Sequence, residues 1–398
     1  MALFKEVKKP VIKGAAAGSG DISPLRPRYV ERTPPCADRC PHGNEIRDVL
    51  VGIAQCQAYG RTPAQAFELA WREITGRNPF PAVCGRICQH PCELGCNRKD
   101  KDGAVAIHLI ERFLGDYAIA HQFKLTKLEA NSAASVAIVG AGPAGLSCAC
   151  HLARRGYAVT VFDAAPQAGG MMRYRMPHSV IPGEVLDAEI ANLLALGVQI
   201  RCGVAIGRDV LVADLRRDHA AVFFAIGLQK ASKLALQRDG EGAVMVGEAP
   251  AGPPDGPYVE VNEPDARVAH TISPAIAQGR SVAEALHAFL SGREPESKLS
   301  PPVIKAEKMK LDWYPAAPPH AEVSPAILFG LTEAEVMEEA KRCLSCGMCM
   351  DCETCWMYCT NNCFLKLPKG EHYKIKVELC NGCKKCADAC PCGYIELN

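Results

Sequence analysis

The stretch Ser135-Val-Ala-Ile-Val-Gly-Ala-Gly-Pro-Ala-Gly-Leu146 decides the fold at the centre of this sequence. Residues 136–139 form a short apolar run rich in β-branched side chains, which is typical of a buried parallel strand. Gly140, Gly142 and Gly145 follow directly, with the spacing G-x-G-x-x-G. In a dinucleotide-binding unit the first glycine allows the tight turn, the second admits the pyrophosphate, and the third lets the next helix pack on the strand.

The segments that follow complete a strand–helix–strand unit. A helix over about residues 144–155 would aim its N-terminal N–H groups at the phosphates, so Pro143 and Ala144 belong to the binding loop. A second strand over 158–162 ends at Asp163, whose carboxylate can bind the ribose hydroxyls. An ordinary glycine-rich turn is the alternative interpretation of the motif alone. Because strand, helix, second strand and acid are in register, the sequence predicts an α/β Rossmann-like dinucleotide-binding domain.

Composition restricts the function of the rest of the chain. Its 398 residues suffice for two or three domains, and its net charge of +1 argues against a nucleic-acid partner. The sequence has neither a signal peptide nor an apolar run of about 18 residues, so we expect a cytoplasmic protein without a membrane span. Cysteines in a reducing compartment rarely form disulfides. Because 12 of the 22 cysteines fall between Cys343 and Cys392, they indicate metal binding.

The C-terminal cysteines have the spacing of a two-cluster bacterial ferredoxin. Cys380-x2-Cys383-x2-Cys386-x3-Cys390-Pro is one run, and Cys349-x2-Cys352-x2-Cys355-x3-Cys359 is a second copy without the proline. In such ferredoxins the fourth cysteine of each run binds the other cluster. A zinc ribbon is the alternative, and Cys363 and Cys392 are left over as non-ligands. We therefore expect two [4Fe-4S] ligand sets: Cys349, Cys352, Cys355 and Cys390, and Cys380, Cys383, Cys386 and Cys359.

A second cysteine block lies nearer the N-terminus, in a stretch with helical periodicity over residues 36–122. Cys36-x3-Cys40 is followed by Cys84-x3-Cys88-x3-Cys92-x3-Cys96. The C-x3-C step places two thiols on one helical face or turn. Zinc is the alternative metal, although zinc sites favour isolated C-x2-4-C pairs. The pair Cys343-x2-Cys346 has no place in either ferredoxin set. The apolar spacing predicts helices over 46–58, 63–74 and 105–119.

With these motifs the chain resembles the glutamate synthase small-subunit family of flavoproteins over residues 36–290. The resemblance implies an N-terminal helical domain with two [4Fe-4S] clusters, followed by an FAD-binding fold. The family pattern opens with Arg-Cys-x2-Cys before the first C-x3-C, whereas residues 31–35 here read Glu-Arg-Thr-Pro-Pro. The matching stretches are Cys36-x3-Cys40-Pro41, Asn78-Pro-Phe-Pro81, Cys84-Gly-Arg-Ile-Cys88, Gly103-Ala-Val105, Ile110-Glu-Arg112 and the glycine fingerprint.

The missing half of the family pattern stands at the other end of the chain, as Arg342-Cys343-Leu-Ser-Cys346. We therefore expect the C-terminal part to fold back, so that Cys343 and Cys346 complete a cluster with Cys36 and Cys96. The Pro-rich segment of 34 residues over 292–325 can reach about 110 Å. Glu111 otherwise has the pattern of a solvated helix position, and Cys84 resembles a structural thiol. For the second cluster the resemblance implies Cys40, Cys88, Cys92 and the carboxylate of Glu111.

The resemblance also implies which residues line the flavin. Gly247-Glu248 stands where the family has Gly-Asp, which contacts the ribityl chain, and a helix beginning near Thr271 would face the flavin pyrimidine with its N-terminus. Family members insert a second nucleotide domain, for NAD(P), but only about twenty residues separate Gly227 from Gly247. Beyond the glycine loop and Asp163, the expected cofactor-binding residues are Gly170, Met171, Arg173, Tyr174, Gly227, Gly247, Glu248, Thr271 and Ile272.

These expectations divide the chain into five parts. They are an extended N-terminal arm (1–35), a helical iron–sulfur domain (36–130), an FAD domain (131–291), a Pro-rich linker wrapping the surface (292–331) and an α+β two-cluster ferredoxin domain (332–398). This layout resembles the flavin subunit of NAD-linked 2-oxoacid:acceptor oxidoreductases, of the phenylglyoxylate dehydrogenase type found in anaerobic aromatic degradation. The resemblance implies a subunit that passes electrons through four [4Fe-4S] clusters to FAD and on to NAD.

The implied partners are thiamine-diphosphate-containing 2-oxoacid-oxidising subunits and ferredoxin-like subunits. The sequence offers no nucleophile or acid–base constellation for substrate chemistry. In the alternative interpretation, the chain is a wiring subunit of another redox complex, of sulfur metabolism or linked to ferredoxin, and does not itself bind NAD. A glutamate synthase small subunit is disfavoured because the NADPH domain is missing.

Overall fold

The computed structural model describes residues 23–129, 132–226, 272–293, 300–319, 330–368 and 370–398. The chain forms two compact units, unit 1 with Met1–Ala70, His90–Ile110 and Leu299–Asn398, and unit 2 with Trp71–Gln89 and Glu111–Lys298. Among the described helices, none is both long and apolar enough to cross a membrane. Four expected cofactor-binding residues lie outside the described residues: Gly227, Gly247, Glu248 and Thr271.

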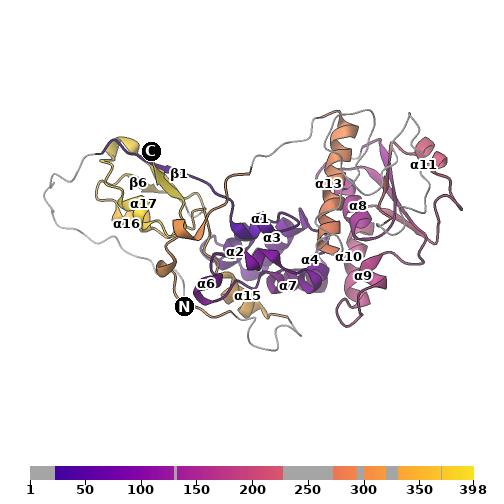
Figure 1. Ribbon diagram of the computed structural model, residues 1–398, viewed down its shortest axis with the longest axis horizontal. Coiled ribbons are helices and arrows are strands. Elements are labelled where there is room, and N and C mark those ends of the chain that lie inside the picture. The colour runs from indigo at the N-terminus through magenta and orange to yellow at the C-terminus, as the bar shows by residue number, and fades with distance from the viewer. Residues whose placement is uncertain (1–22, 130–131, 227–271, 294–299, 320–329, 369) are drawn as a thin grey trace. The chain divides into compact units, whose positions relative to one another are not determined.

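Unit 2 contains a parallel sheet of four strands, as the glycine motif predicts (Figure 1). Val136 and Ile138 of the strand β2 pack in one core cluster, and Ala137 and Val139 pack in another, so side chains cover both faces of the sheet. This explains why the strand is apolar throughout rather than alternating. In order across the sheet, the strands are β4 (Gln199–Cys202), β3 (Ala158–Asp163), β2 (Ser135–Val139) and β5 (Ala221–Phe224).

The helices of unit 2 include a closely packed pair, α8 (Pro143–Arg154) and α13 (Ile272–Ser291). A Cβ at Gly279 would lie 2.1 Å from the carbonyl oxygen of Ala144, so only glycine permits this approach. The Ser147 hydroxyl adds a 2.7 Å hydrogen bond to the carbonyl of Ile276. Among the described residues, the other helices that belong wholly to unit 2 are α4 (Pro81–Ile87), α9 (Met171–Tyr174), α10 (Gly183–Ala195) and α11 (Val212–Asp218).

Unit 1 contains the remaining short helices of the cysteine-rich segments. In α2 the residues Ile46, Val49, Leu50 and Ile53 are buried, which is the helical spacing expected from the sequence, although the helix ends at Ala54. The helix α15 (Glu333–Ala340) packs against α2 (Ile46–Ala54) and begins with a capping box. Two helices, α3 (Pro63–Thr75) and α7 (Ile107–Ala120), contribute residues to both units. The helices wholly within unit 1 include α1 (Pro35–Arg39), α2 (Ile46–Ala54), α5 (Pro91–Leu94), α6 (Lys99–Asp102) and α15 (Glu333–Ala340).

The C-terminal part of unit 1 is an α+β arrangement completed by the N-terminal arm. The strand β1 (Pro27–Tyr29) pairs antiparallel with β8 (Ile395–Leu397), and Tyr29 stacks on Tyr394 with ring centroids 4.9 Å apart. A second antiparallel pair lies within the C-terminal sequence itself. This pair consists of β6 (Phe364–Lys366) and β7 (Tyr373–Ile375). The other elements of this part are α16 (Thr354–Tyr358), the 3-10 turn η4 (Val377–Leu379) and α17 (Lys385–Ala389).

The Pro-rich segment differs from the surface linker expected from its composition. Over residues 300–319 it forms two 3-10 turns, η1 (Ala306–Lys308) and η2 (Leu311–Trp313). Its side chains Ile304, Met309 and Tyr314 are buried in one core cluster with Leu344 and Met350. The segment therefore forms part of the unit 1 core. Its three apolar residues stand at irregular spacing among the prolines, so the sequence shows no periodicity that would predict their burial.

Candidate functional site

Thiols from both ends of the chain gather in unit 1. Burial raises the pKa of the Cys36 thiol well above its usual value, and the nearby thiols of Cys343, Cys346 and Cys96 raise it further. The thiols of Cys343 and Cys96 likewise raise the pKa of Cys346, after burial. These four residues, which we name the shared thiol group, are the set expected from the fold-back of the chain. Four converging thiols suit a metal cluster, which needs thiolate ligands.

Hydrogen-bond donors already point at two sulfur atoms of the shared thiol group. The backbone N–H of Ser345 lies 3.4 Å from Cys343 Sγ, and the side-chain amide of Asn97 lies 3.6 Å from Cys346 Sγ. Donors of this kind stabilise a thiolate over a thiol, because they favour the charged form. These donors lower the pKa of the Cys343 and Cys346 thiols, but burial outweighs them and raises it.

A buried ionic network holds the two ends of the chain together beside this group. The guanidinium of Arg98 donates to both carboxylate oxygens of Asp102 at 2.6 Å and to the carbonyl oxygen of Arg342 at 2.7 Å. Arg342 in turn donates to Glu339 at 2.6 Å, and Glu339 accepts the N–H of Ala106 at 2.8 Å. Arg98, Arg342 and Glu339 are 2%, 3% and 0% exposed. Removing Arg342 would leave the buried carboxylate of Glu339 without its ion-pair partner, which is destabilising.

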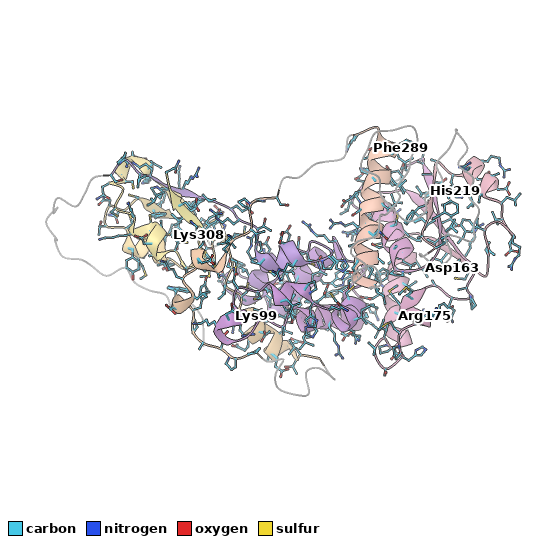
Figure 2. All side chains as sticks on the ribbon, in the orientation of Figure 1. Lys99, Asp163, Arg175, His219, Phe289 and Lys308 are labelled. Carbon is cyan, nitrogen blue, oxygen red and sulfur yellow. The ribbon has the colours of Figure 1, made fainter. Side chains whose placement is uncertain are left out.

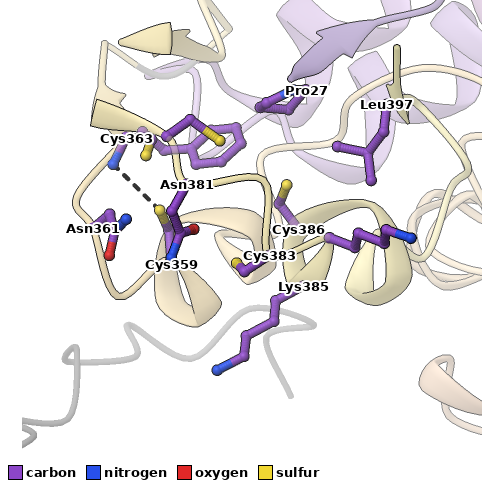
Figure 3. Close-up of a pocket in the computed structure, with 12 residues that line it drawn as sticks. Pro27, Cys359, Asn361, Cys363, Asn381, Cys383, Lys385, Cys386 and Leu397 are labelled. Carbon is purple, nitrogen blue, oxygen red and sulfur yellow. Dashed lines mark hydrogen bonds between the residues drawn. The ribbon is translucent and has the colours of Figure 1, made fainter. Parts of the chain in front are cut away.

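The two predicted ferredoxin sets also come together as the crossed spacing requires. Burial raises the pKa of Cys355, and its neighbouring thiols are Cys352, Cys349 and Cys390, which we name the inner set. Burial also raises the pKa of Cys386 to about 12, and its neighbours are Cys383, Cys359 and Cys380, which we name the outer set. The four cysteines of the outer set line one cavity (Figure 3).

The two leftover cysteines lie beside these sets. The N–H of Cys363 donates to Cys359 Sγ at 3.2 Å (Figure 3), and Cys392 Sγ lies 3.7 Å from Cys390 Sγ. Backbone N–H groups also point at ligand sulfurs, from Asp351 to Cys349 and from Gly382 to Cys380. Repeated N–H···S contacts of this kind are among the features by which proteins tune iron–sulfur clusters.

Tyr314 packs in one core cluster with Cys346 of the shared thiol group and Cys352 of the inner set. Its hydroxyl donates to the carbonyl oxygen of Leu344 at 2.7 Å. Burial raises the pKa of its phenol well above the usual value, and the thiols of Cys392, Cys346, Cys352 and Cys343 raise it further. Cys343 and Cys346 belong to the shared thiol group and Cys352 belongs to the inner set, so one buried ring has neighbours in two candidate redox centres.

The residues of the second expected N-terminal set are divided between the units. Cys40 and Cys92 belong to unit 1, where α1 packs against α5, and Cys88 and Glu111 belong to unit 2. Glu111 accepts a 2.9 Å hydrogen bond from the amide of Asn78. Burial raises the pKa of Cys84, and its nearby groups include Glu111 and Cys88. Ligation by this set stays a prediction.

The glycine loop of unit 2 is built as its spacing predicts. A Cβ at Gly140 would lie 2.3 Å from the carbonyl oxygen of Ala225, and one at Gly145 would lie 1.9 Å from that of Gly140. Both positions therefore need glycine for packing. A Cβ at Gly142 would meet no atom of the described residues within 4 Å. Gly142 caps α8, so this space lies at the helix N-terminus, where a pyrophosphate would approach.

Asp163 at the end of β3 anchors this loop (Figure 2). Its two carboxylate oxygens accept the N–H groups of Ala141 at 2.6 Å and Ala165 at 2.8 Å. Two backbone N–H groups therefore already orient the carboxylate that is expected to bind the ribose. Each oxygen retains a second lone pair for a sugar hydroxyl.

The segment after β3 packs against the glycine loop. A Cβ at Gly170 would lie 2.6 Å from the Cα of Gly142, which brings the two glycine stretches together. Arg173 forms an ion pair with Asp187 and donates to the carbonyl of Ala168 at 2.6 Å, so its guanidinium has a structural task. The remaining expected flavin residues in this part divide by exposure: Met171 and Tyr174 are exposed, and Ile272 is buried.

Sequence reasoning missed several residues that hold these sites. Arg98, Glu339 and Arg342 look like surface charges in their local patterns, and Tyr314 stands in a Pro-rich segment. Glu189 is buried and accepts the N–H groups of Ala82 at 2.7 Å and Val83 at 3.2 Å. Burial raises its pKa to about 8. The available signal was its place on the same helical face as Leu186, Ile190 and Leu193.

Comparisons with known proteins agree with this division of sites. Residues 29–123 match the family described as dihydropyrimidine dehydrogenase domain II, 4Fe-4S cluster, and residues 138–199 match the NAD(P)-binding Rossmann-like domain. Among solved structures, that of FprA, a Mycobacterium tuberculosis oxidoreductase, matches 24% of this chain and 23% of its own at 21% identity. Its TM-score is 0.23.

Similar curated proteins are oxidoreductase subunits. The beta subunit of the NADP(+)-dependent formate dehydrogenase of Moorella thermoacetica is 35% identical over 58% of this chain and 34% of its own. The beta subunit of the NADPH-Fe(3+) oxidoreductase of Geobacter sulfurreducens is 34% identical over 54% and 31%. Subunit PreT of the NAD-dependent dihydropyrimidine dehydrogenase of Escherichia coli K12 is 32% identical over 51% and 47%.

The chain thus spans about a third to a half of the length of these curated relatives. The chain is therefore similar, in these two segments, to a 4Fe-4S domain and an NAD(P)-binding Rossmann-like domain, and the relatives named above are subunits of NAD(P)-linked oxidoreductases. The finer expectation of a phenylglyoxylate dehydrogenase subunit stays a prediction.

Proposed function

We propose that this chain is the FAD- and [4Fe-4S]-containing electron-transfer subunit of a multisubunit oxidoreductase and passes electrons to NAD(P)+. The observation that supports this most is the shared thiol group, because it joins both cysteine blocks in one unit of a chain that also carries a dinucleotide loop. Bound iron–sulfur clusters would exchange single electrons, and a bound flavin would pool the two that a hydride acceptor needs.

In this proposal the residues of the chain position the cofactors and do no acid–base chemistry on a substrate. The ligands would come as four sets of four, and Tyr314 packs with Cys346 of the shared thiol group and Cys352 of the inner set. The sets are Cys36, Cys96, Cys343 and Cys346; Cys40, Cys88, Cys92 and Glu111; Cys349, Cys352, Cys355 and Cys390; and Cys359, Cys380, Cys383 and Cys386.

A substitution in the glycine loop can distinguish an effect on cofactor binding from an effect on folding. Gly142→Val places its side chain in open space, so we expect an unchanged unfolding temperature but at least a tenfold loss of bound flavin. Flavin content is measured by absorbance after acid extraction, and chromatography of the extract distinguishes FAD from a nicotinamide nucleotide. Gly52→Val in α2, where a Cβ also meets open space, is the matched control. Full flavin retention by the Gly142 variant would contradict the assignment.

A second function is favoured by one feature of the sequence. Only about twenty residues separate Gly227 from Gly247, where the resembled family inserts its NAD(P) domain. The chain could then serve as a wiring subunit whose nicotinamide site lies on a partner. NADH oxidation by the isolated chain, with a viologen dye as acceptor, separates the two. Activity that follows FAD content supports the first function, and complete inactivity of flavin-loaded chain supports the second.

We further propose a 2-oxoacid, of the phenylglyoxylate type, as the source of electrons. This proposal is supported by the order of the chain's parts, in which a two-cluster ferredoxin spacing follows the flavin domain. Partners that co-purify with the chain test it. A thiamine-diphosphate enzyme among them would support the proposal, and a formate- or pyrimidine-oxidising subunit in its place would refute it.

A further inference from the structure

One candidate ligand differs from all others in its exposure. All 22 cysteines lie among the described residues, and Cys383 is the only one that is exposed. It belongs to the outer set, and the cavity lined by that set also includes Asn361, Lys384 and Lys385 (Figure 3). Electron transfer between proteins requires a redox centre close to the surface, so this thiol marks the point of nearest access.

The inner set is covered where the outer set is open. Tyr29 of the arm strand β1 packs against the core cluster that contains Cys355 and Cys390 of the inner set. The Tyr29 hydroxyl donates to the carbonyl oxygen of Tyr373 at 2.6 Å, which closes this side. A partner protein therefore reaches the ferredoxin part most closely at Cys383.

Apolar side chains are exposed in the turn that leads into Cys380, another cysteine of the outer set. Val377 and Leu379, in the turn η4 that leads into Cys380, are 42% and 46% exposed. The carbonyl oxygen of Leu379 accepts a 3.2 Å hydrogen bond from Asn361, which holds this turn at the rim of the cavity. Grouped apolar side chains at a surface redox centre are typical of a protein-binding site.

The charges of this rim favour an acidic partner. Lys384 and Lys385 directly follow the exposed thiol and are themselves exposed. Lys376 adds a third positive charge, and Glu378 and Asp388 are the two carboxylates in the same stretch. Glu378 directly precedes Leu379, and Asp388 lies near the C-terminal end of α17. The charged residues that directly follow Cys383 in the sequence are therefore the two lysines.

We propose that Val377, Leu379, Cys383, Lys384 and Lys385, the Cys383 face, dock a small one-electron carrier protein that presents carboxylates around its own redox centre. The proposal rests on the proposed electron-transfer function. In the exchange, the reduced carrier loses one electron and the centre held by the outer set gains it, without making or breaking a bond and without moving a proton.

The test measures docking without electron transfer. The full chain, with its iron reconstituted, is titrated with an oxidised acidic bacterial two-cluster ferredoxin, and Kd is measured at low and moderate ionic strength. For Lys384→Glu with Lys385→Glu we expect Kd to rise at least about tenfold at low salt and to lose most of its salt dependence. Lys305→Glu with Lys308→Glu is the matched control, with the same charge change on the exposed η1 segment, and should raise Kd less than about twofold (Figure 2).

Leu379→Ser tests the same face without changing charge and should raise Kd about fivefold. Iron content and dithionite reduction of every variant must equal those of the parent chain, which separates docking from cofactor loss. Equal weakening by both lysine pairs, or none by either, overturns the proposal while the electron-transfer function stands. A parent chain that binds no iron overturns the electron-transfer function itself. If the lysine variant loses iron, Leu379→Ser alone decides, and an unchanged Kd then overturns the docking face.

Discussion

The inner and outer ferredoxin sets and the shared thiol group are built in opposite ways. The ferredoxin sets take all eight cysteines from residues 349–390, so local loops and the short helices α16 and α17 bring their sulfurs together. The shared thiol group takes Cys36 and Cys96 from one end and Cys343 and Cys346 from the other. Its geometry therefore depends on contacts distant in sequence, chiefly the buried ionic network. The comparison teaches that similar ligand chemistry can depend on local spacing or on the whole fold.

Arg342→Ala should produce the largest difference between the shared thiol group and the ferredoxin sets. It leaves the fully buried Glu339 without its ion-pair partner, while Asp102 keeps Arg98, and this costs about 3–5 kcal/mol in the free energy of unfolding of unit 1. We expect loss of the iron held by the shared thiol group and retention of both ferredoxin signals in electron paramagnetic resonance. Lys341→Ala is the control, because its surface ion pair with Glu338 contributes less than about 1 kcal/mol. Equal effects of the two substitutions would contradict the importance of the network.

Cys343→Ser with Cys346→Ser removes two ligands without disturbing the network. If the shared thiol group holds a [4Fe-4S] cluster, the variant should lose about four irons per chain and keep both ferredoxin signals. Iron analysis and paramagnetic resonance of the reduced chain measure this. Cys202→Ser, at a half-buried cysteine outside every set, is the control and should leave the iron content unchanged. Unchanged iron in the double variant would refute the shared ligand set.

Tyr314→Phe should have the smallest effect. The change removes the hydroxyl that donates to Leu344 but keeps the ring, so we expect a loss of about 1–3 kcal/mol in the free energy of unfolding. Iron content should stay at the parent value, because no ligand changes. Urea unfolding measures the difference, with the exposed Tyr358→Phe as control. Loss of iron here would mean that the hydroxyl itself organises the adjoining thiols.

The sequence was informative where structure depends on local spacing. The glycine loop, the strands on both sides of it and the helix α8 appear as expected, because each depends on neighbouring residues. The crossed ferredoxin sets follow from the same kind of rule. Even the distant pair at Cys343 and Cys346 could be assigned, but only because a resembled family pattern was incomplete at one end and completed at the other.

The contacts that hold the distant parts together could not be predicted. Arg342 and Glu339 stand in a Glu-rich helical segment whose pattern suggests solvent exposure, yet both are buried because Arg98 and Asp102 supply partners from far along the chain. Pairing of β1 with β8 involves three residues on each side, too short for a sequence signal. Burial of Tyr314 depends on the same fold-back, so no local rule could have placed it.

The shared thiol group also dictates an order of events during synthesis. When the ribosome has completed residues 36–96, two of its four thiols exist, and the other two emerge only after about 250 further residues. The group cannot close before that point, whereas each ferredoxin run is made as one short block. Cys36 and Cys96 must therefore be protected from oxidation and from stray metal ions while most of the chain is still being translated.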